Sequence, residues 1–284
     1  IMKQRIITGI LFTMVILAFV IPGYYFRWIT IALTILVSII TAYEMGKTLE
    51  AKGIRYARSL LYIGASFSFI PVFLFPLVDT AYTVFTVYAL FSLMYSMISI
   101  ILPALFHASD GRITDGVASS VSALYISFPM ACANTMLLFV RDGWLFFALG
   151  LFSPWISDVF AYFTGVFLGK HKIVPHISPK KTWEGCVGGA VGTAAIVAVF
   201  FSIVIFPNFE SRLSFSGFLI ASVCVGILLS VVSQFGDWTA SAIKRWAGIK
   251  DFGSMLPGHG GLLDRFDSAF FTLPVAFVFG LLLV

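Results

Sequence analysis

The sequence predicts an all-α, polytopic integral membrane helical bundle with about nine transmembrane helices. Of its 284 residues, 60% are hydrophobic and only 11% are charged, and the mean hydropathy is +1.00. Soluble domains are about 45–50% apolar and about 25% charged. The apolar residues fall in runs of about 20, the length that a helix needs to cross the hydrocarbon core. The alternating pattern of a membrane β-barrel is missing.

Nine apolar segments account for the predicted helices. They are residues 5–23, 28–46, 59–78, 80–103, 117–140, 144–168, 185–206, 216–243 and 262–284. The first follows a basic start and lacks an A-x-A cleavage site, so we expect a retained helix rather than a signal peptide. No internal repeat or low-complexity linker divides the chain, which indicates a single integral membrane domain over residues 1–284.

Loop charges orient these helices with the N-terminus in the cytoplasm. In that topology fifteen of the 18 Lys and Arg residues fall in cytoplasmic loops, and only Arg27, Arg141 and Arg212 fall outside. This asymmetry is typical of the positive-inside rule. It accounts for the net charge of +5 without a nucleic-acid partner, whose basic patches interleaved with aromatics are absent. The three cysteines have no metal-ligand spacing, and we interpret them as buried apolar residues.

Two cytoplasmic loops, 170–184 and 244–265, combine charges with Pro and His, the second also with Gly, and we expect the functional site there. In "GGLLDRFDS" Asp264 and Asp267 are spaced i, i+3, so on a helix their carboxylates share a face. Two such groups repel unless a cation lies between them. The alternative is that both acids simply favour the positive end of a helix.

The end of the eighth span carries polar residues on one helical face. Asp237, Ser241 and Arg245 are spaced i, i+4 and i+8. An acid preceded by some twenty mostly apolar residues is costly in lipid and usually faces a partner inside the protein. That partner is either a ligand or, in the alternative reading, Lys244 or Arg245 in a structural pair. Asp158, embedded in the sixth span, raises the same question.

Glycine and proline dominate "GIKDFGSMLPGHGG", between these two groups. They indicate a backbone that turns sharply and approaches another group closely. With Lys250 and His259 nearby, a glycine-rich turn that leads into a helix is a candidate anion cradle.

The other loop ends in "SPKKTWEG". Lys180 and Lys181 follow a helix-stopping proline, and Thr182 is expected to cap the seventh helix. Glu184 then falls in the first turn, where the helix dipole alone explains an acid as well as a functional role does. Small residues four apart predict close helix packing at Gly185/Gly189 and Gly188/Gly192.

Together these residues indicate a metal-dependent site for a phosphorylated substrate. The acids are Asp158, Asp237, Asp264 and Asp267, and the bases are Lys180, Lys181, Lys244, Arg245, Lys250 and Arg265. Oxygen ligands without a His or Cys cluster favour a hard cation such as Mg²⁺. A metal among many bases suits a polyphosphate. No Walker A or protein-kinase motif is present, which excludes those soluble nucleotide-binding folds.

Residues 241–245, 250–253 and 256–267 resemble, with fixed spacing, the signature of the phosphatidate cytidylyltransferase (CDP-diacylglycerol synthase) family. The stretch 158–185 is similar to the family's other recurrent block, and the first 140 residues match only in hydropathy. One departure is Ala240, where many members have a glutamate before the serine. The resemblance implies Mg²⁺-dependent conversion of CTP and phosphatidic acid to CDP-diacylglycerol and pyrophosphate. It further implies a multi-pass protein of the cytoplasmic membrane in bacteria, or of an organelle membrane, with its site facing the cytoplasm.

The resemblance also implies roles for the candidate residues. Mg²⁺, with a second cation left open, would be held by Asp237, Asp264 and Asp267. The catalytic set would be Lys244, Arg245, Lys250, Arg265 and Asp264, which neutralise and position the phosphates. Substrate binding would fall to Lys180, Lys181, Ser241, His259, Gly260, Gly261 and Asp158. Residues 141–284 would then hold the catalytic helices and cytoplasmic loops, and the helices of 1–140 keep no assigned role.

Three other functions compete with this one. An ion-coupled transporter would use the intramembrane acids, but no inverted repeat is visible and the acids gather toward one membrane face. A CDP-alcohol phosphotransferase would need Ala-Arg after Asp-Gly, which neither Asp110-Gly111 nor Asp142-Gly143 has. A synthase acting on an ether lipid, giving CDP-archaeol, fits the same motif. Membrane lipids are expected partners, and a homodimer is left open.

Overall fold

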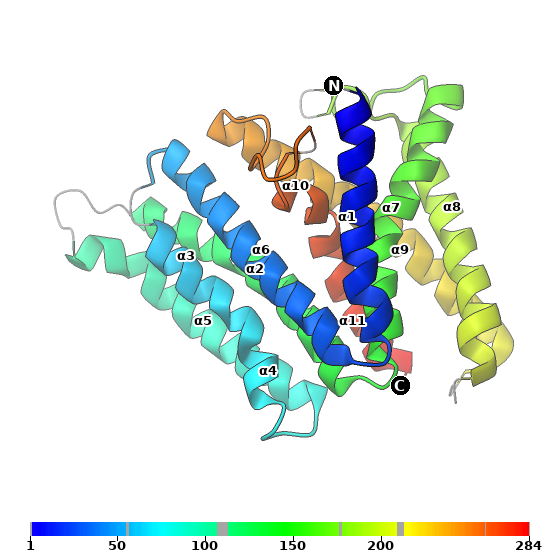
Figure 1. The fold of residues 1–284 in the computed structure, drawn as a ribbon, viewed down its shortest axis with the longest axis horizontal. Coiled ribbons are helices and arrows are strands. Elements are labelled where there is room, and N and C mark those ends of the chain that lie inside the picture. Colours follow the sequence, from blue (N-terminus) through cyan, green and yellow to red (C-terminus); the bar gives the residue numbers. More distant parts are fainter. Residues whose placement is uncertain are drawn as a thin grey trace. The chain divides into compact units, whose positions relative to one another are not determined.

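A computed structural model of the chain describes residues 2–54, 57–106, 113–175, 178–208, 213–258 and 260–283. Within these ranges the regular structure is helical, and β-type pairing is limited to two isolated bridges. The predicted all-α fold is therefore confirmed. Seven helices of the described part are long and apolar enough to cross a membrane (Figure 1). His259 and Arg212, both named above, lie outside the described residues.

The described chain forms two compact units, and the first comprises residues 1–140 and 243–266. Its elements are α1 (Met2–Gly23), α2 (Arg27–Ala51), α3 (Ala57–Ser66), the 3₁₀ turn η1 (Phe67–Phe69), α4 (Ile70–Leu74), α5 (Ala81–Phe106), α6 (Ile113–Phe139) and α10 (Leu263–Phe266). Helix α6 packs against α2, α3 and α5 (Figure 1). On α6 the buried Asn134 amide donates to the Ser68 carbonyl oxygen (2.8 Å) and accepts from the Thr34 hydroxyl (2.6 Å). A polar group is thus satisfied inside an apolar bundle, where an unpaired one is costly.

The predicted single helix over 59–78 is wrong in detail, because the chain there forms α3, η1 and α4 in succession. Pro71 lies in the first turn of α4. A proline has no backbone N–H to donate to the preceding turn, so an unbroken helix through this position would lose a hydrogen bond. The Ser68 hydroxyl donates to the Ala65 carbonyl oxygen (2.8 Å) within the tightened turn. This segment is consequently shorter and more irregular than its neighbours.

The second unit comprises residues 141–242 and 267–284. Its elements are α7 (Gly143–Leu168), α8 (Trp183–Phe200), the π-helical turn η2 (Phe201–Ile205), the 3₁₀ turn η3 (Phe206–Asn208), α11 (Ala269–Leu283) and α9 (Phe215–Ala247) as far as Ala242. Helix α7 packs against α8 and α11 (Figure 1). The rings of Phe146, Phe201 and Phe279 form an aromatic cluster with centroids 5.4 to 6.0 Å apart.

Glycines on α8 bring that helix close to α7, as their spacing predicts. A Cβ added at Gly188 would lie 2.1 Å from Thr164 Oγ1, and one at Gly192 would lie 2.1 Å from the Phe160 ring. Such close approach is the usual function of small residues at four-residue spacing in membrane helices. The structural interpretation of these glycines is therefore confirmed.

We expect Gly188→Ala to destabilise the protein by about 1–3 kcal/mol, because the methyl group would overlap Thr164 in a packed interface. Gly217→Ala on α9 is the matched control, since a Cβ there meets its nearest atom at an ordinary 3.4 Å. Thermal unfolding of the detergent-solubilised variants measures the difference. Equal melting temperatures for the two variants would show that α7 and α8 do not pack this closely.

Candidate functional site

The glycine-rich loop (residues 248–262) begins where α9 ends. Gly248 has a left-handed φ of 75°. Its N–H donates to the Arg245 carbonyl oxygen (3.1 Å), and the Ile249 N–H donates to that of Lys244 (2.9 Å). This pair of bonds is the common glycine-terminated helix end. Later in the loop the Leu256 N–H donates to the Gly260 carbonyl oxygen (2.9 Å), so the chain doubles back before entering α10.

Asp264, on α10, holds this loop from within. Its Oδ1 accepts a 2.6 Å hydrogen bond from Lys244 Nζ, and its Oδ2 accepts the backbone N–H groups of Phe252 and Gly261, both at 2.9 Å. The Asp264 side chain is only 4% exposed. Hydrogen bonds to an ionised carboxylate are shorter and stronger than neutral ones. Asp264 therefore joins the end of α9, the middle of the loop and the start of α10.

A second carboxylate, Glu44 on α2, also binds the loop, and sequence reasoning missed it. Glu44 is 3% exposed. Its Oε1 accepts the Leu262 N–H (2.9 Å) and its Oε2 accepts the Leu263 N–H (2.7 Å). The signal that could have found it is a lone acid inside the apolar segment 28–46, near its end, since an acid within a span usually has a specific partner.

Residues of the glycine-rich loop, together with Arg265 of α10, line a partly open polar pocket of about 570 Å³. It is lined by Lys250, Asp251, Gly253, Ser254, Leu256, Pro257, Gly258, Gly260 and Arg265. Gly258 and Gly260 have positive φ values of 77° and 82°, a conformation that glycine adopts without steric cost. The hollow expected beside Lys250 is thus present, and its affinity for an anion stays a prediction.

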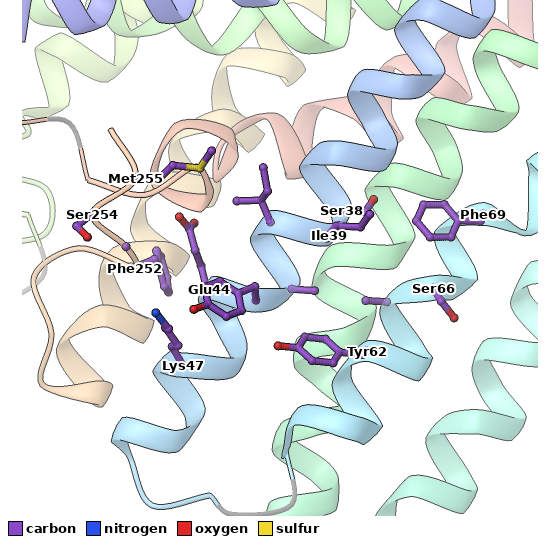
Figure 2. Close-up of a pocket in the computed structure, with 15 residues that line it drawn as sticks. Ser38, Ile39, Glu44, Lys47, Tyr62, Ser66, Phe69, Phe252, Ser254 and Met255 are labelled. Atoms are coloured by element: carbon purple, nitrogen blue, oxygen red, sulfur yellow. The ribbon is translucent and has the colours of Figure 1, made fainter. Parts of the chain in front are cut away.

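An apolar pocket of about 690 Å³ lies between α2, α3 and the glycine-rich loop (Figure 2). Its lining is Ser38, Ile39, Ile40, Ala42, Tyr43, Glu44, Lys47, Tyr62, Ala65, Ser66, Phe69, Phe252, Gly253, Ser254 and Met255. Residues 253 and 254 line the polar pocket as well. A short stretch of loop backbone therefore has a polar hollow and an apolar hollow next to it.

In the second unit, the loop between α7 and α8 is anchored at its end. Thr182 caps α8 as predicted, because its Oγ1 accepts the Gly185 N–H (3.2 Å). Glu184 accepts the backbone N–H groups of Lys170 (3.1 Å) and His171 (3.3 Å), and its Oε1 lies 2.6 Å from His171 Nδ1. Glu184 thus holds the first residues of this loop against α8, which is a structural role beyond the first-turn preference.

Lys181 and Asp237 form an ion pair between this loop and α9, with Nζ and Oδ2 2.5 Å apart. Burial alone would disfavour the charged ammonium, but attraction to Asp237 and, more weakly, to Asp158 outweighs burial and raises the pKa of Lys181. The alternative reading paired Asp237 with Lys244 or Arg245 of the same helix. The structure instead pairs Asp237 with Lys181 and pairs Lys244 with Asp264.

The expected i, i+3 helical pairing of Asp264 and Asp267 is wrong, because α10 ends at Phe266 and α11 begins at Ala269. Asp267 lies in the turn between them, where its Oδ1 accepts the Ser268 N–H (2.6 Å). Such a local side-chain bond competes with helical continuation. A Cβ at Gly236 would lie 2.7 Å from the Asp267 carbonyl oxygen, so the backbone next to Asp237 contacts the Asp267 turn.

The predicted site residues are therefore assembled in two groups. The first unit holds Lys244, Arg245, Lys250, Gly260, Gly261, Asp264 and Arg265, and the second holds Asp158, Lys180, Lys181, Asp237, Ser241 and Asp267. In the first group, Asp264 directly contacts Lys244 and Gly261. Across the described residues no set of three or more His, Cys, Asp or Glu side chains is arranged to hold a metal by itself.

Comparison with known proteins gives consistent matches. The model of the cytidylyltransferase family matches residues 3–283. A phosphatidate cytidylyltransferase of Bacillus subtilis is 31% identical over 96% of this chain and 95% of its own length. That of Thermotoga maritima is 38% identical over 57% of each chain, and that of Staphylococcus saprophyticus is 41% identical over 47% of this chain and 48% of its own. The latter two matches thus span about half the length of those relatives.

Proposed function

The chain belongs to the cytidylyltransferase family, and on that premise we propose that it is a phosphatidate cytidylyltransferase. It would transfer the cytidylyl group of CTP to phosphatidic acid, giving CDP-diacylglycerol and pyrophosphate. The similar proteins of Bacillus subtilis and Thermotoga maritima carry that name.

The observation that carries this proposal is the pair of pockets on either side of residues 253–254. The reaction joins a water-soluble triphosphate to the headgroup of a lipid, so it needs a cationic hollow next to an apolar one. Lys250 and Arg265 line the polar pocket. The lining of the apolar pocket includes one basic residue, Lys47. We assign the triphosphate to the polar pocket and an acyl chain of the lipid to the apolar pocket.

The reaction requires that the two substrates be positioned and their charges neutralised, and it does not require a strong base. An oxygen of the lipid phosphate attacks the α-phosphorus of CTP, the bond to the β-phosphate oxygen breaks, and pyrophosphate leaves. The lipid phosphate is already anionic at neutral pH, so it needs no deprotonation to act as a nucleophile. Lys250 and Arg265 would neutralise the charge that gathers on the leaving pyrophosphate.

We propose that carboxylates of this site hold a magnesium ion together with the nucleotide, since no described set of carboxylates is arranged to hold one alone. Mg²⁺ is usually bound by one or two carboxylates together with substrate phosphates, and not by a complete protein cage. The contact of Gly236 with the Asp267 turn brings two candidate ligands, Asp237 and Asp267, to adjoining backbone. The bound metal would polarise the phosphates of CTP.

For the membrane topology we propose nine spans with a cytoplasmic N-terminus. In addition to the seven long helices of the described residues there are two shorter apolar helical segments, Arg58–Leu74 (α3, η1 and α4) and Ala269–Leu283 (α11). Counting both gives nine spans. Shorter spans are accommodated by local thinning of the bilayer or by flanking residues that reach the interface. This topology places the glycine-rich loop on the cytoplasmic side of the cell membrane, where CTP is available.

The direct test is incorporation of radiolabelled CTP into lipid by the purified protein in detergent, with Mg²⁺ and phosphatidic acid. Labelled CDP-diacylglycerol is expected, and its loss with EDTA would support the metal. A folded protein that produces no labelled lipid from any substrate would exclude the enzyme and favour the transporter. Parallel reactions with a dialkyl-ether phosphate distinguish the archaeol-type synthase, which would prefer that substrate.

We expect Ser66→Trp to raise the KM for phosphatidic acid about tenfold and to leave the KM for CTP unchanged. Ser66 lines the apolar pocket, and an indole ring there would occupy space assigned to the acyl chain. Ile63→Trp is the control, because Ile63 is equally on α3 and 53% exposed but does not line the pocket. Equal KM values for phosphatidic acid in the two variants would contradict the assignment of the acyl chain to this pocket.

A further inference from the structure

Glu44 lies outside both motif-bearing loops, yet it accepts hydrogen bonds from the last residue of the glycine-rich loop and from the first residue of α10. Its partners Leu262 and Leu263 are 218 and 219 residues away along the chain. In Figure 2 the Glu44 side chain extends from α2 toward the loop segment that carries Phe252 and Met255. A nearly inaccessible carboxylate is expensive unless it is fully hydrogen-bonded, so its placement calls for a specific role.

Two carboxylates together accept three consecutive backbone N–H groups at the end of the loop. Asp264 Oδ2 accepts from Gly261, and Glu44 accepts from Leu262 and Leu263 with one oxygen each. Asp264 is part of the segment that it binds, whereas Glu44 belongs to α2. Glu44 therefore ties the end of the loop to the helical scaffold of the first unit.

The glycines at positions 253 and 261 support the same role independently. A Cβ at either position would lie 2.5 Å from Glu44 Oε1, which is closer than real Cβ atoms come. Neither residue has a positive φ, in contrast to Gly258 and Gly260 of the same loop. The backbone conformation at 253 and 261 thus does not require glycine. The close approach of the Glu44 carboxylate is what leaves no room for a side chain there.

We propose that Glu44 is a positioning residue: it sets the place of the glycine-rich loop, and through it that of Lys250 and Arg265, around the phosphates. The inference rests on the proposed cytidylyltransferase function for its kinetic consequence, but its structural consequence can be measured without turnover. Loss of Glu44 should loosen the loop and leave the packing of α2 against α6 in place.

Glu44→Gln tests this with almost no change in shape. A carboxamide has one acceptor oxygen, so one of the two N–H groups loses its partner and faces an NH₂ group instead. Glu50→Gln is the matched control, because Glu50 is an exposed residue of the same helix that pairs with Arg58. We expect kcat/KM for CTP to fall about tenfold in Glu44→Gln and to stay within twofold of wild type in Glu50→Gln.

Hydrogen exchange of backbone amides separates positioning from general damage, since local opening is measured segment by segment. In Glu44→Gln, faster exchange is expected in residues 250–263 and unchanged exchange in α6. Exchange and kinetics both equal to wild type would overturn the proposal, and so would faster exchange spread over α2 and α6. If the wild type forms no CDP-lipid, the proposed function fails while the exchange experiment still decides the role of Glu44.

A double-mutant cycle with Gly261→Ala provides the sharpest test. In the wild-type background the added methyl group meets Glu44, so about a tenfold or greater loss of kcat/KM is expected. In the Glu44→Ala background that clash is gone, and Gly261→Ala should cost little more. Strong non-additivity is the mark of residues in contact. Additive losses would overturn the proposal, and the Glu50→Ala background, where additivity is expected, calibrates the measurement.

Discussion

Asp264→Asn is expected to lower kcat/KM about hundredfold or more while the protein still inserts in the membrane. The Asp264 side chain is almost inaccessible and accepts from Lys244 and from two loop N–H groups. An asparagine has a single acceptor oxygen and must turn its NH₂ group toward either the ammonium or the N–H groups. Breaking a buried pair from one side typically costs about 3–5 kcal/mol, because the other charge is left without its partner.

Asp79→Asn is the control, because it makes the same chemical change at an exposed acid between α4 and α5. The double variant Asp264→Asn/Lys244→Met removes both charges, so we expect it to regain thermal stability but not activity. If Asp264→Asn keeps activity within a few-fold of wild type, Asp264 neither holds the loop in its active arrangement nor acts as a metal ligand.

Asp237→Asn should raise the Mg²⁺ concentration for half-maximal activity about 10–100-fold. The expectation follows from the predicted ligand role of Asp237, since even groups that merely support a metal ligand change affinity 10–100-fold. Lys181 holds the same carboxylate at 2.5 Å and should compete with the metal. Lys181→Met is therefore expected to shift the Mg²⁺ dependence in the opposite direction.

Asp142→Asn is the matched control in the same unit, because asparagine adopts the left-handed φ of 53° found there as readily as aspartate. A Mg²⁺ titration of CTP turnover measures all three variants. An unchanged Mg²⁺ dependence in Asp237→Asn would exclude Asp237 as a ligand and leave the ion pair with Lys181 as its role.

The charge state of Lys181 should not limit activity near neutral pH. Its pKa is raised above the ordinary value of 10.5, so its stabilising contribution is complete below that value and is lost only as the pH rises through the still higher folded value. A change of activity between pH 6 and 9 must then come from other groups or from the substrates. The same pH profile in wild type and in Lys181→Met over that range checks this.

Local patterns in the sequence were sufficient for the features that depend on neighbours along the chain. The all-helical membrane architecture, the Thr182 cap and the close packing at Gly188 follow from length, capping chemistry and residue spacing. The relation between Asp264 and Asp267 could not be predicted in this way. Whether a helix continues for three more residues depends on a side-chain bond, here from Ser268 to Asp267, that competes with helical bonding at small cost.

What the sequence by itself determined is the family, the helical membrane fold and the two loops that hold the charged residues, because motifs and hydropathy are properties of contiguous residues. Only the tertiary structure decided how those charges are partnered. It pairs Asp237 with Lys181, surrounds Asp264 with Lys244 and loop amides, and brings Glu44 to the loop. The physical reason is that hydrogen bonds and ion pairs act over about 3 Å. Which groups come that close, across hundreds of residues of chain, depends on how the helices pack.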